Sequence, residues 1–356
     1  MKYLIRVGVV VFWAALICGV LYLPEVNFFS REKNSINIFA WGDILEPAVV
    51  AEFEKTTGIK VYLNYYSSNE ELLVKIKATR GEGYDLIIPS DYTVEYLAKD
   101  GLLKKLDHSK CTFFKDLNPI LMNHTFDPGN VYSLPLEWEV FGLGIDKTYF
   151  EGRMPVPSWD MVFKPHGYKL VMINDPVETI LIAGYYLYGP ETNKLTNLQL
   201  KGVQNLLIDQ KKFIEAYADF RGDYFIATKN SPVAVATSSY IWRTMRRFPH
   251  IGFIIPQEGS FLSLENIAIP AATKKEDLVY EFLNYIYSPE SVATHYETFG
   301  FFPPTLNALH LMDLDPIAES IIRSSPEQFK LFYFTKILAT QQQMRDLWVE
   351  VKAASN

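Results

Sequence analysis

The sequence predicts an α/β protein with two lobes, each a mostly parallel sheet flanked by helices, joined by two crossover strands. In residues 36–89, short apolar strands alternate with amphipathic helices, as in parallel sheets whose strands are joined by helices. A second alternation begins near residue 168. The chain has 356 residues, a length at which one core usually divides into two.

The first alternating unit predicts three strands separated by two helices. Gly58 ends the first of these helices, and Ser68 and Asn69 precede the second, as capping residues do. The strands are predicted over residues 36–41, 59–66 and 84–89, and the helices over 47–57 and 70–80. Ligands of such sheets bind beyond the carboxyl ends of the strands, so residues 41–43, 67–69 and 90–92 are the segments of interest.

The second unit predicts strands over residues 168–174 and 231–237, a helix over 176–188 and a long helix over 198–218. Residues 131–146 and 250–270 are extended and apolar, which suits strands that cross between lobes. The predicted first lobe is residues 36–139 plus 264–308. The second lobe is residues 140–263 plus 309–356.

The first 26 residues are typical of an export signal or membrane anchor. Lys2 and Arg6 precede the uncharged, apolar residues 7–23, which is the order found in export signals. A cleaved signal, lipidation at Cys18 and a retained anchor remain alternatives. Each of them places the remaining chain outside the cytoplasm, in the periplasm.

Composition and motifs argue against several function classes. The chain carries 34 Lys plus Arg against 41 Asp plus Glu, a formal charge of -7, whereas nucleic-acid binding needs clustered positive charge. Cys18 and Cys111 form no metal-binding spacing, and the six histidines are scattered. Nucleophile-elbow, dinucleotide, P-loop and zinc-protease motifs are absent from the sequence. We therefore expect no enzymatic activity, no cofactor and no metal.

The residues that follow the predicted strands combine aromatic rings with carboxylates. Trp41 and Asp43 follow the first strand, Ser90 and Tyr92 the third, and Asp175 and Glu178 the strand that opens the second unit. An organic cation needs this mixture, because carboxylates neutralise buried ammonium groups and ring faces attract them. An anion site would show Arg, Lys or bare helix N-termini there.

Each of these residues also has a structural interpretation. Asp175 and Glu178 fit a helix-capping box with Pro176 at the first helical position. Asp43 could equally cap the helix that follows it. Trp41 could lie in the core, and the Tyr92 hydroxyl could face solvent.

Four segments, in order, resemble a known family. Residues 54–107, 126–146 (FDPGNVYSLPLEWEVFGLGID), 264–273 (LENIAIPAAT) and 297–304 (ETFGFFPP) are similar to the periplasmic spermidine/putrescine-binding proteins of ABC-type polyamine importers. The resemblance implies a two-lobed periplasmic-binding-protein fold that closes on one polyamine and delivers it to a membrane permease.

Carried over by position, the resemblance implies a set of ligand contacts: Trp41, Asp43, Ser90, Tyr92, Asp175, Glu178, Glu265 and Phe301. Trp138, in the first crossover, is expected to form a wall. The sequence departs from the family at Gly42 and Ile44, and Ala236 and Ser263 stand where the spermidine binder has tryptophans. Fewer ring faces weaken cation–π attraction, so the preferred polyamine stays open.

The resulting hypothesis is a monomeric, exported solute-binding protein whose partners are a polyamine and an ABC permease. The same fold binding an amino acid derivative, a sugar or ferric iron is an alternative. A secreted hydrolase with paired carboxylates is a second alternative, although its acids would have to flank a scissile bond, whereas Asp175 and Glu178 lie on one turn.

Overall fold

In the computed structural model, the described residues are 34–354 without Gly152, Pro165, Asp219 and Phe220, together with Arg6 and Trp13. Apart from Arg6 and Trp13, the predicted export segment lies outside the described residues. Among the residues described, no helix is both long enough and apolar enough to cross a membrane.

The first part of the chain forms three parallel strands with helices between them. Its elements are β1 (Ser35–Trp41), α2 (Pro47–Thr57), β2 (Lys60–Tyr66), α3 (Asn69–Thr79), β3 (Leu86–Ile87) and α4 (Asp91–Lys99). Gly58 ends α2 in the left-handed conformation at φ 71°, and the Ser68 side chain caps α3. The sequence therefore predicted these boundaries closely, although β3 is shorter than expected.

The middle of the chain forms a second set of strands with helices between them. Its elements are β4 (Ser133–Asp146), α5 (Asp160–Phe163), β5 (Leu170–Ile173), α6 (Pro176–Tyr188), α7 (Asn197–Gln210), β6 (Ile214–Ala218), α8 (Gly222–Ala227), β7 (Val233–Thr237), α9 (Ser238–Met245), β8 (Ile251–Ile254) and β9 (Ser260–Ala268). Strand β5 pairs in parallel with β6 and β7.

Two predictions in this part were wrong. The long helix over residues 198–218 ends at Gln210, and residues 214–218 form β6, whose Ile214 is buried against Leu170 of β5. The apolar segment 250–270 is two strands separated by a turn at Gly259, where φ is 97°. Only β9 therefore serves as the second crossover.

The last part of the chain contributes to both sets. It comprises α10 (Glu276–Ile286), α11 (Pro289–Phe299), α12 (Pro316–Ile322), α13 (Pro326–Phe329), β10 (Phe332–Phe334) and α14 (Gln341–Ala353). Helix α10 packs on β1 and α2, whereas α14 packs on α6 and α7. Strand β10 runs parallel to β9.

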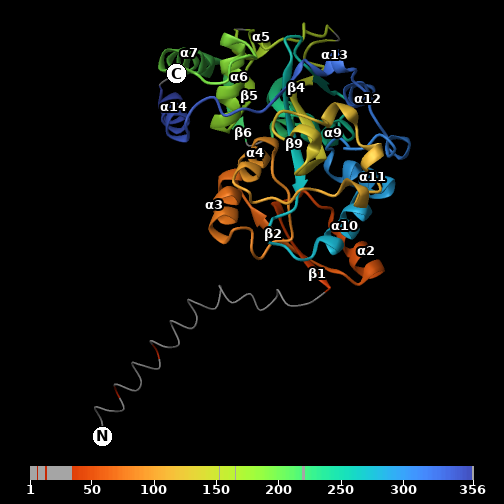
Figure 1. The fold of residues 1–356 in the computed structure, drawn as a ribbon. Helices are drawn as coiled ribbons and strands as arrows, with labels where there is room; N and C mark the ends of the chain where they lie inside the picture. Colours follow the sequence, from red (N-terminus) through yellow and green to blue (C-terminus); the bar gives the residue numbers. More distant parts are fainter. Residues whose placement is uncertain are drawn as a thin grey trace.

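The long antiparallel strands β4 and β9 connect the two sets. Along the main path the strand order is β2-β1-β3-β9-β4-β7-β5-β6, with β10 on β9 and β8 on β4. Figure 1 shows β4 and β9 running between a half surrounded by α2, α3 and α10 and a half surrounded by α6, α7 and α14. The carboxyl ends of β1 and β5 therefore face each other across these strands.

Each half has its own apolar core. Ile36, Phe53 and Phe282 belong to the core of the β1 half, and Met172 and Leu207 belong to that of the β5 half. Two further apolar clusters lie around Trp138 and Phe302 and around Phe39 and Tyr66.

Candidate functional site

The predicted site residues line one cavity of about 360 Å³ between the two halves. This volume lies in the range of small-molecule sites, about 300–1,000 Å³. The cavity lining includes all nine predicted residues: Trp41, Asp43, Ser90, Tyr92, Trp138, Asp175, Glu178, Glu265 and Phe301. The topology thus brings together side chains that are more than two hundred positions apart in the sequence.

Ser90 and Tyr92 belong to a hydrogen-bonded group at the end of β3. The Asn69 amide donates to the Ser90 hydroxyl at 3.0 Å and to the Tyr92 hydroxyl at 2.8 Å. Ser90 Oγ in turn donates to Glu265 Oε1 at 2.6 Å. The Tyr92 hydroxyl is therefore held inside the cavity region and does not simply point to solvent.

Trp41 approaches the same carboxylate from β1. Its Nε1–H donates to Glu265 Oε2 at 3.1 Å, and its ring lies 4.6 Å from the Tyr66 ring. Glu265 thus has a donor on each oxygen and one fixed orientation.

Asp43 is exposed and lies in the left-handed region at φ 59°. The interpretation of Asp43 as a helix cap is wrong, because α2 is capped by the Glu46 side chain, which accepts from the Ala48 amide at 3.3 Å. The Asp43 carboxylate stands at the cavity mouth, where it adds negative charge.

Asp175 does cap a helix. Its Oδ1 accepts from the Glu178 amide at 2.9 Å at the start of α6, with Pro176 at the first helical position. Glu178 Oε2, however, is buried without a hydrogen-bond partner among the described residues. An unpaired buried oxygen is costly, so Glu178 Oε2 is available to accept a hydrogen bond.

Four further acids that were not predicted as site residues line the cavity: Glu70, Asp91, and Glu137 and Glu139 of β4. Glu137 is directly opposite Glu265, and Glu139 is opposite Ser263. Alternate residues of a strand share a face, so Glu137 and Glu139 of the LEWEV segment lie on the same face of β4, and both line the cavity. The signal was a pair of acids at alternate positions of a strand that is otherwise largely apolar.

Burial shifts the protonation of these acids. It raises the pKa of Glu265 to about 8, with the hydrogen bond from Ser90 opposing the shift and nearby Glu137 and Asp91 adding to it. Burial also raises the pKa of Asp91 to about 7. The pKa of Glu178 rises well above its usual range through burial and then through the charges of Asp175 and Glu139.

Aromatic residues contribute less open ring surface than the sequence suggested. Trp138 is 1% exposed, its ring lies edge-on to Phe302 and Phe329, and its Nε1–H donates to Pro303 O at 3.1 Å. Trp138 therefore backs the cavity from the core. Phe301 is half-buried and lies on the cavity wall, as does the small Ser263.

Ala236 is fully buried within β7, so it adds nothing to the cavity wall. Tyr240 and Trp242, the aromatics nearest to it in sequence, are also absent from the lining described for the cavity. Neither aromatic side chain of α9 therefore replaces the tryptophan that the spermidine binder has at the position of Ala236.

The charges around the cavity have one sign. Of the described residues that line it, none is Lys, Arg or His. The acids that line it are Asp43, Glu70, Asp91, Glu137, Glu139, Asp175, Glu178 and Glu265. No group of three or more described His, Cys, Asp or Glu side chains has the arrangement of a metal site. Chemically, this arrangement can neutralise an organic cation.

Residues 48–319 match the family described as bacterial extracellular solute-binding protein. The chain belongs to this family. The putrescine-binding periplasmic protein SpuD of Pseudomonas aeruginosa is 30% identical over 352 residues, covering 91% of this chain and 93% of that protein. The spermidine/putrescine-binding periplasmic protein of Escherichia coli is 27% identical over 320 residues, covering 88% and 90%.

Solved structures confirm the predicted two-lobed fold of this solute-binding protein. A spermidine/putrescine ABC transporter protein from Listeria monocytogenes is similar at 27% identity with a TM-score of 0.76, covering 90% of this chain and 99% of that one. The PotD substrate-binding protein of Streptococcus pneumoniae gives a TM-score of 0.75 at 25% identity, covering 90% and 99%. The family consists of solute-binding proteins, in agreement with the expectation that the chain is not an enzyme.

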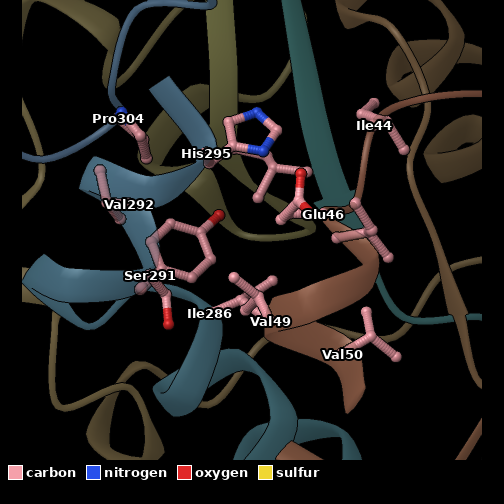
Figure 2. Close-up of a pocket in the computed structure, with 12 residues that line it drawn as sticks. Ile44, Glu46, Val49, Val50, Ile286, Ser291, Val292, His295 and Pro304 are labelled. Atoms are coloured by element: carbon pink, nitrogen blue, oxygen red, sulfur yellow. The ribbon is translucent and has the colours of Figure 1, made fainter. Parts of the chain in front are cut away.

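Behind Glu137, the solute-binding protein has a second, apolar pocket of about 30 Å³, too small for an organic ligand. Figure 2 shows this pocket between α2 and the α10–α11 pair, with the His295 ring projecting into it beside Glu46. His295 Nε2 hydrogen-bonds to Glu137 Oε2. Burial lowers the pKa of His295 to about 4 and raises that of Glu137. Both shifts favour the uncharged pair, in which one proton is shared between the imidazole and the carboxyl group.

Proposed function

We propose that this protein binds a polyamine outside the cytoplasm and delivers it to an ABC permease. The observation that carries the proposal is the cavity of about 360 Å³, lined by acids from both halves and by no basic side chain of the described chain. A buried ammonium group needs such partners, since an unpaired buried charge is costly. The relatives named as binding spermidine or putrescine support the same ligand class.

The proposed contacts divide between the halves. Asp175 and Glu178 hold ammonium at the start of α6, and Glu265 holds it at the opposite wall. Asp43 adds charge at the mouth, Ser90 orients Glu265, and Trp41, Tyr92 and Phe301 contact methylene groups, with Trp138 supporting them from behind. The ligand favours the closed arrangement by its greater affinity for it.

We further propose lobes of residues 36–139 plus 264–308 and 140–263 plus 309–356, a monomeric protein, and a periplasmic location reached through residues 1–26. The periplasmic relatives support this location. Cleavage of the signal, lipidation at Cys18 and retention as an anchor remain open choices for that segment.

Other solutes fit the cavity less well. Ferric iron needs converging tyrosine and histidine ligands, and among the described lining residues only Tyr92 is of either type. An anionic amino acid derivative would find no Lys, Arg or His side chain among the described lining residues to pair with its negative charge. A carboxylate-dependent hydrolase is a poor match to a family of solute-binding proteins.

The test is a thermal-unfolding panel on protein stripped of ligand by unfolding and refolding. Putrescine, cadaverine, spermidine and spermine are compared with butylamine and succinate. Ligand at about 100 times its dissociation constant stabilises the fold by about 2.7 kcal/mol, so at least one polyamine raises the melting temperature and the controls do not. A flat response to all four polyamines rejects the proposal.

A further inference from the structure

Four acids of the cavity form a row, and its two middle members, Glu137 and Glu139, have no assigned role. Glu265 lies opposite Glu137 across β9 and β4, and Glu137 and Glu139 are alternate residues of β4. The charge of Glu139 acts on both Glu137 and Glu178. The row therefore runs from Glu265 through Glu137 and Glu139 to Glu178.

Glu137 and Glu139 differ in their partners. Glu137 is 2% exposed and is bound to His295 from α11, with Glu46 beside that ring. Glu139 Oε2 instead accepts from the Ser239 hydroxyl at the start of α9. Burial raises the pKa of both acids, but hydrogen bonds from Ser239 and Thr237 oppose the rise at Glu139. Because such donors stabilise a carboxylate in its charged form, Glu139 holds its charge more readily than Glu137.

Glu139 is half-buried and lines the cavity. Its cross-strand neighbour is Ser263, which has a short side chain and lines the cavity too. Arg243 of α9 acts on Glu139 electrostatically, and its guanidinium lies over the Tyr240 ring, 4.7 Å from the ring centroid. The nearby Glu178 Oε2 is a buried oxygen without a partner in the described chain.

We propose that Glu139 is an internal ammonium subsite, and that the cavity therefore selects a ligand with three or more ammonium groups over a diamine. This inference rests on the proposed function. The terminal ammonium groups bind at Glu265 and at the Asp175–Glu178 pair, and a secondary ammonium between them binds at Glu139. Positions two apart on a strand are separated by about 6.6 Å, comparable with the spacing of amines across a four-carbon chain.

The test compares spermidine with 1,8-diaminooctane, which has the same length but no internal nitrogen, and with putrescine. Titration calorimetry on the unmodified protein is expected to show at least about tenfold tighter binding of spermidine than of 1,8-diaminooctane, the effect of one good ionic hydrogen bond. This comparison needs no variant, so it does not depend on the folding of a mutant.

In Glu139→Gln, spermidine affinity is expected to fall about tenfold or more and 1,8-diaminooctane affinity less than about threefold. The matched control is Glu215→Gln, an exposed acid of β6 outside the cavity lining, which leaves the preference intact. Equal weakening of both ligands, or no preference for spermidine in the unmodified protein, overturns the subsite and leaves the proposed function standing. Failure of every amine to bind overturns both.

Discussion

Glu137 and Glu265 occupy directly opposed positions of the antiparallel strands β4 and β9, so two acids face each other on the cavity side of the sheet. Like charges in opposed positions destabilise a sheet. His295 behind Glu137 and the Ser90 and Trp41 donors on Glu265 offset this repulsion. Under the proposed function, an ammonium group in front of the pair would offset the remaining repulsion, which leads to the first prediction.

Glu265→Gln is expected to weaken polyamine binding by about 2 kcal/mol or more, because it leaves a buried ammonium group without its charged partner. Stability without ligand should change little or increase, since the glutamine still accepts a hydrogen bond and removes a buried acid. Calorimetric titration and urea unfolding measure the two effects. Unchanged affinity would show that Glu265 does not contact the ligand.

Stability without ligand is expected to fall as the pH rises from about 5 to 8, as linkage requires for acids whose folded pKa is raised. The folded pKa values of Asp91 and Glu265 are about 7 and about 8, above their unfolded values. Their contribution is therefore fully present below the unfolded pKa and is lost as the pH rises through the folded one. Urea unfolding at several pH values measures this trend.

Polyamine binding should show the opposite trend over the same range. A bound cation favours the ionised acids, so affinity rises with pH and protons are released on binding. Calorimetry in buffers of different ionisation enthalpy counts those protons. Affinity that is constant or falls over this range, with no proton release, would contradict the protonation states inferred for Glu265 and Asp91.

Two substitutions of Asp175 separate its role as a helix cap from its proposed role in ligand binding. Asparagine caps helices about as well as aspartate, so Asp175→Asn should cost less than about 0.5 kcal/mol of stability, whereas Asp175→Ala should cost about 1 kcal/mol. Both variants should lose polyamine affinity, because both remove the charge. If Asp175→Asn binds as tightly as the unmodified protein, capping is the only role of Asp175.

At Gly142, the backbone of the crossover strand β4 packs closely against Phe253 and Ile254 of β8. A Cβ added there would lie 2.5 Å from the Phe253 ring and 2.8 Å from the Ile254 carbonyl oxygen. Gly142→Ala is therefore expected to destabilise the fold by about 1–3 kcal/mol, the usual range for overpacking. Gly42→Ala is the control, because its Cβ would meet nothing within 4 Å. Thermal unfolding of the two variants compares them, and equal melting temperatures would contradict the close contact.

Much of the fold could be predicted because local signals and long-range packing agree. Gly58 after α2 and Ser68 before α3 are strong local stop and start signals, and both occur at the predicted boundaries. The helix over residues 198–218 was extended too far because Ile214 also suits a helical apolar face. Its burial on Leu170 is a long-range contact that no local pattern shows.

The candidate site was predictable in part for the same reason. Residues that directly follow β1, β3 and β5 could be placed by the rule for parallel sheets. Glu137 and Glu139 lie within a strand, and their side was decided only by the register of β4 on β9. Residues near the end of the chain, Thr335 and Ile337, carry no local signal of a site, yet they line the cavity.

Thr335 and Ile337 follow β10, while Trp41 ends the first strand of the described chain, and all three border the same chamber. During synthesis, the wall of the cavity is therefore incomplete until the residues that follow β10 have been translated. Fragments that stop earlier would expose acids without their enclosing walls. Under the proposed function, a chain truncated before β10 should therefore bind polyamine more weakly even where the remaining residues fold.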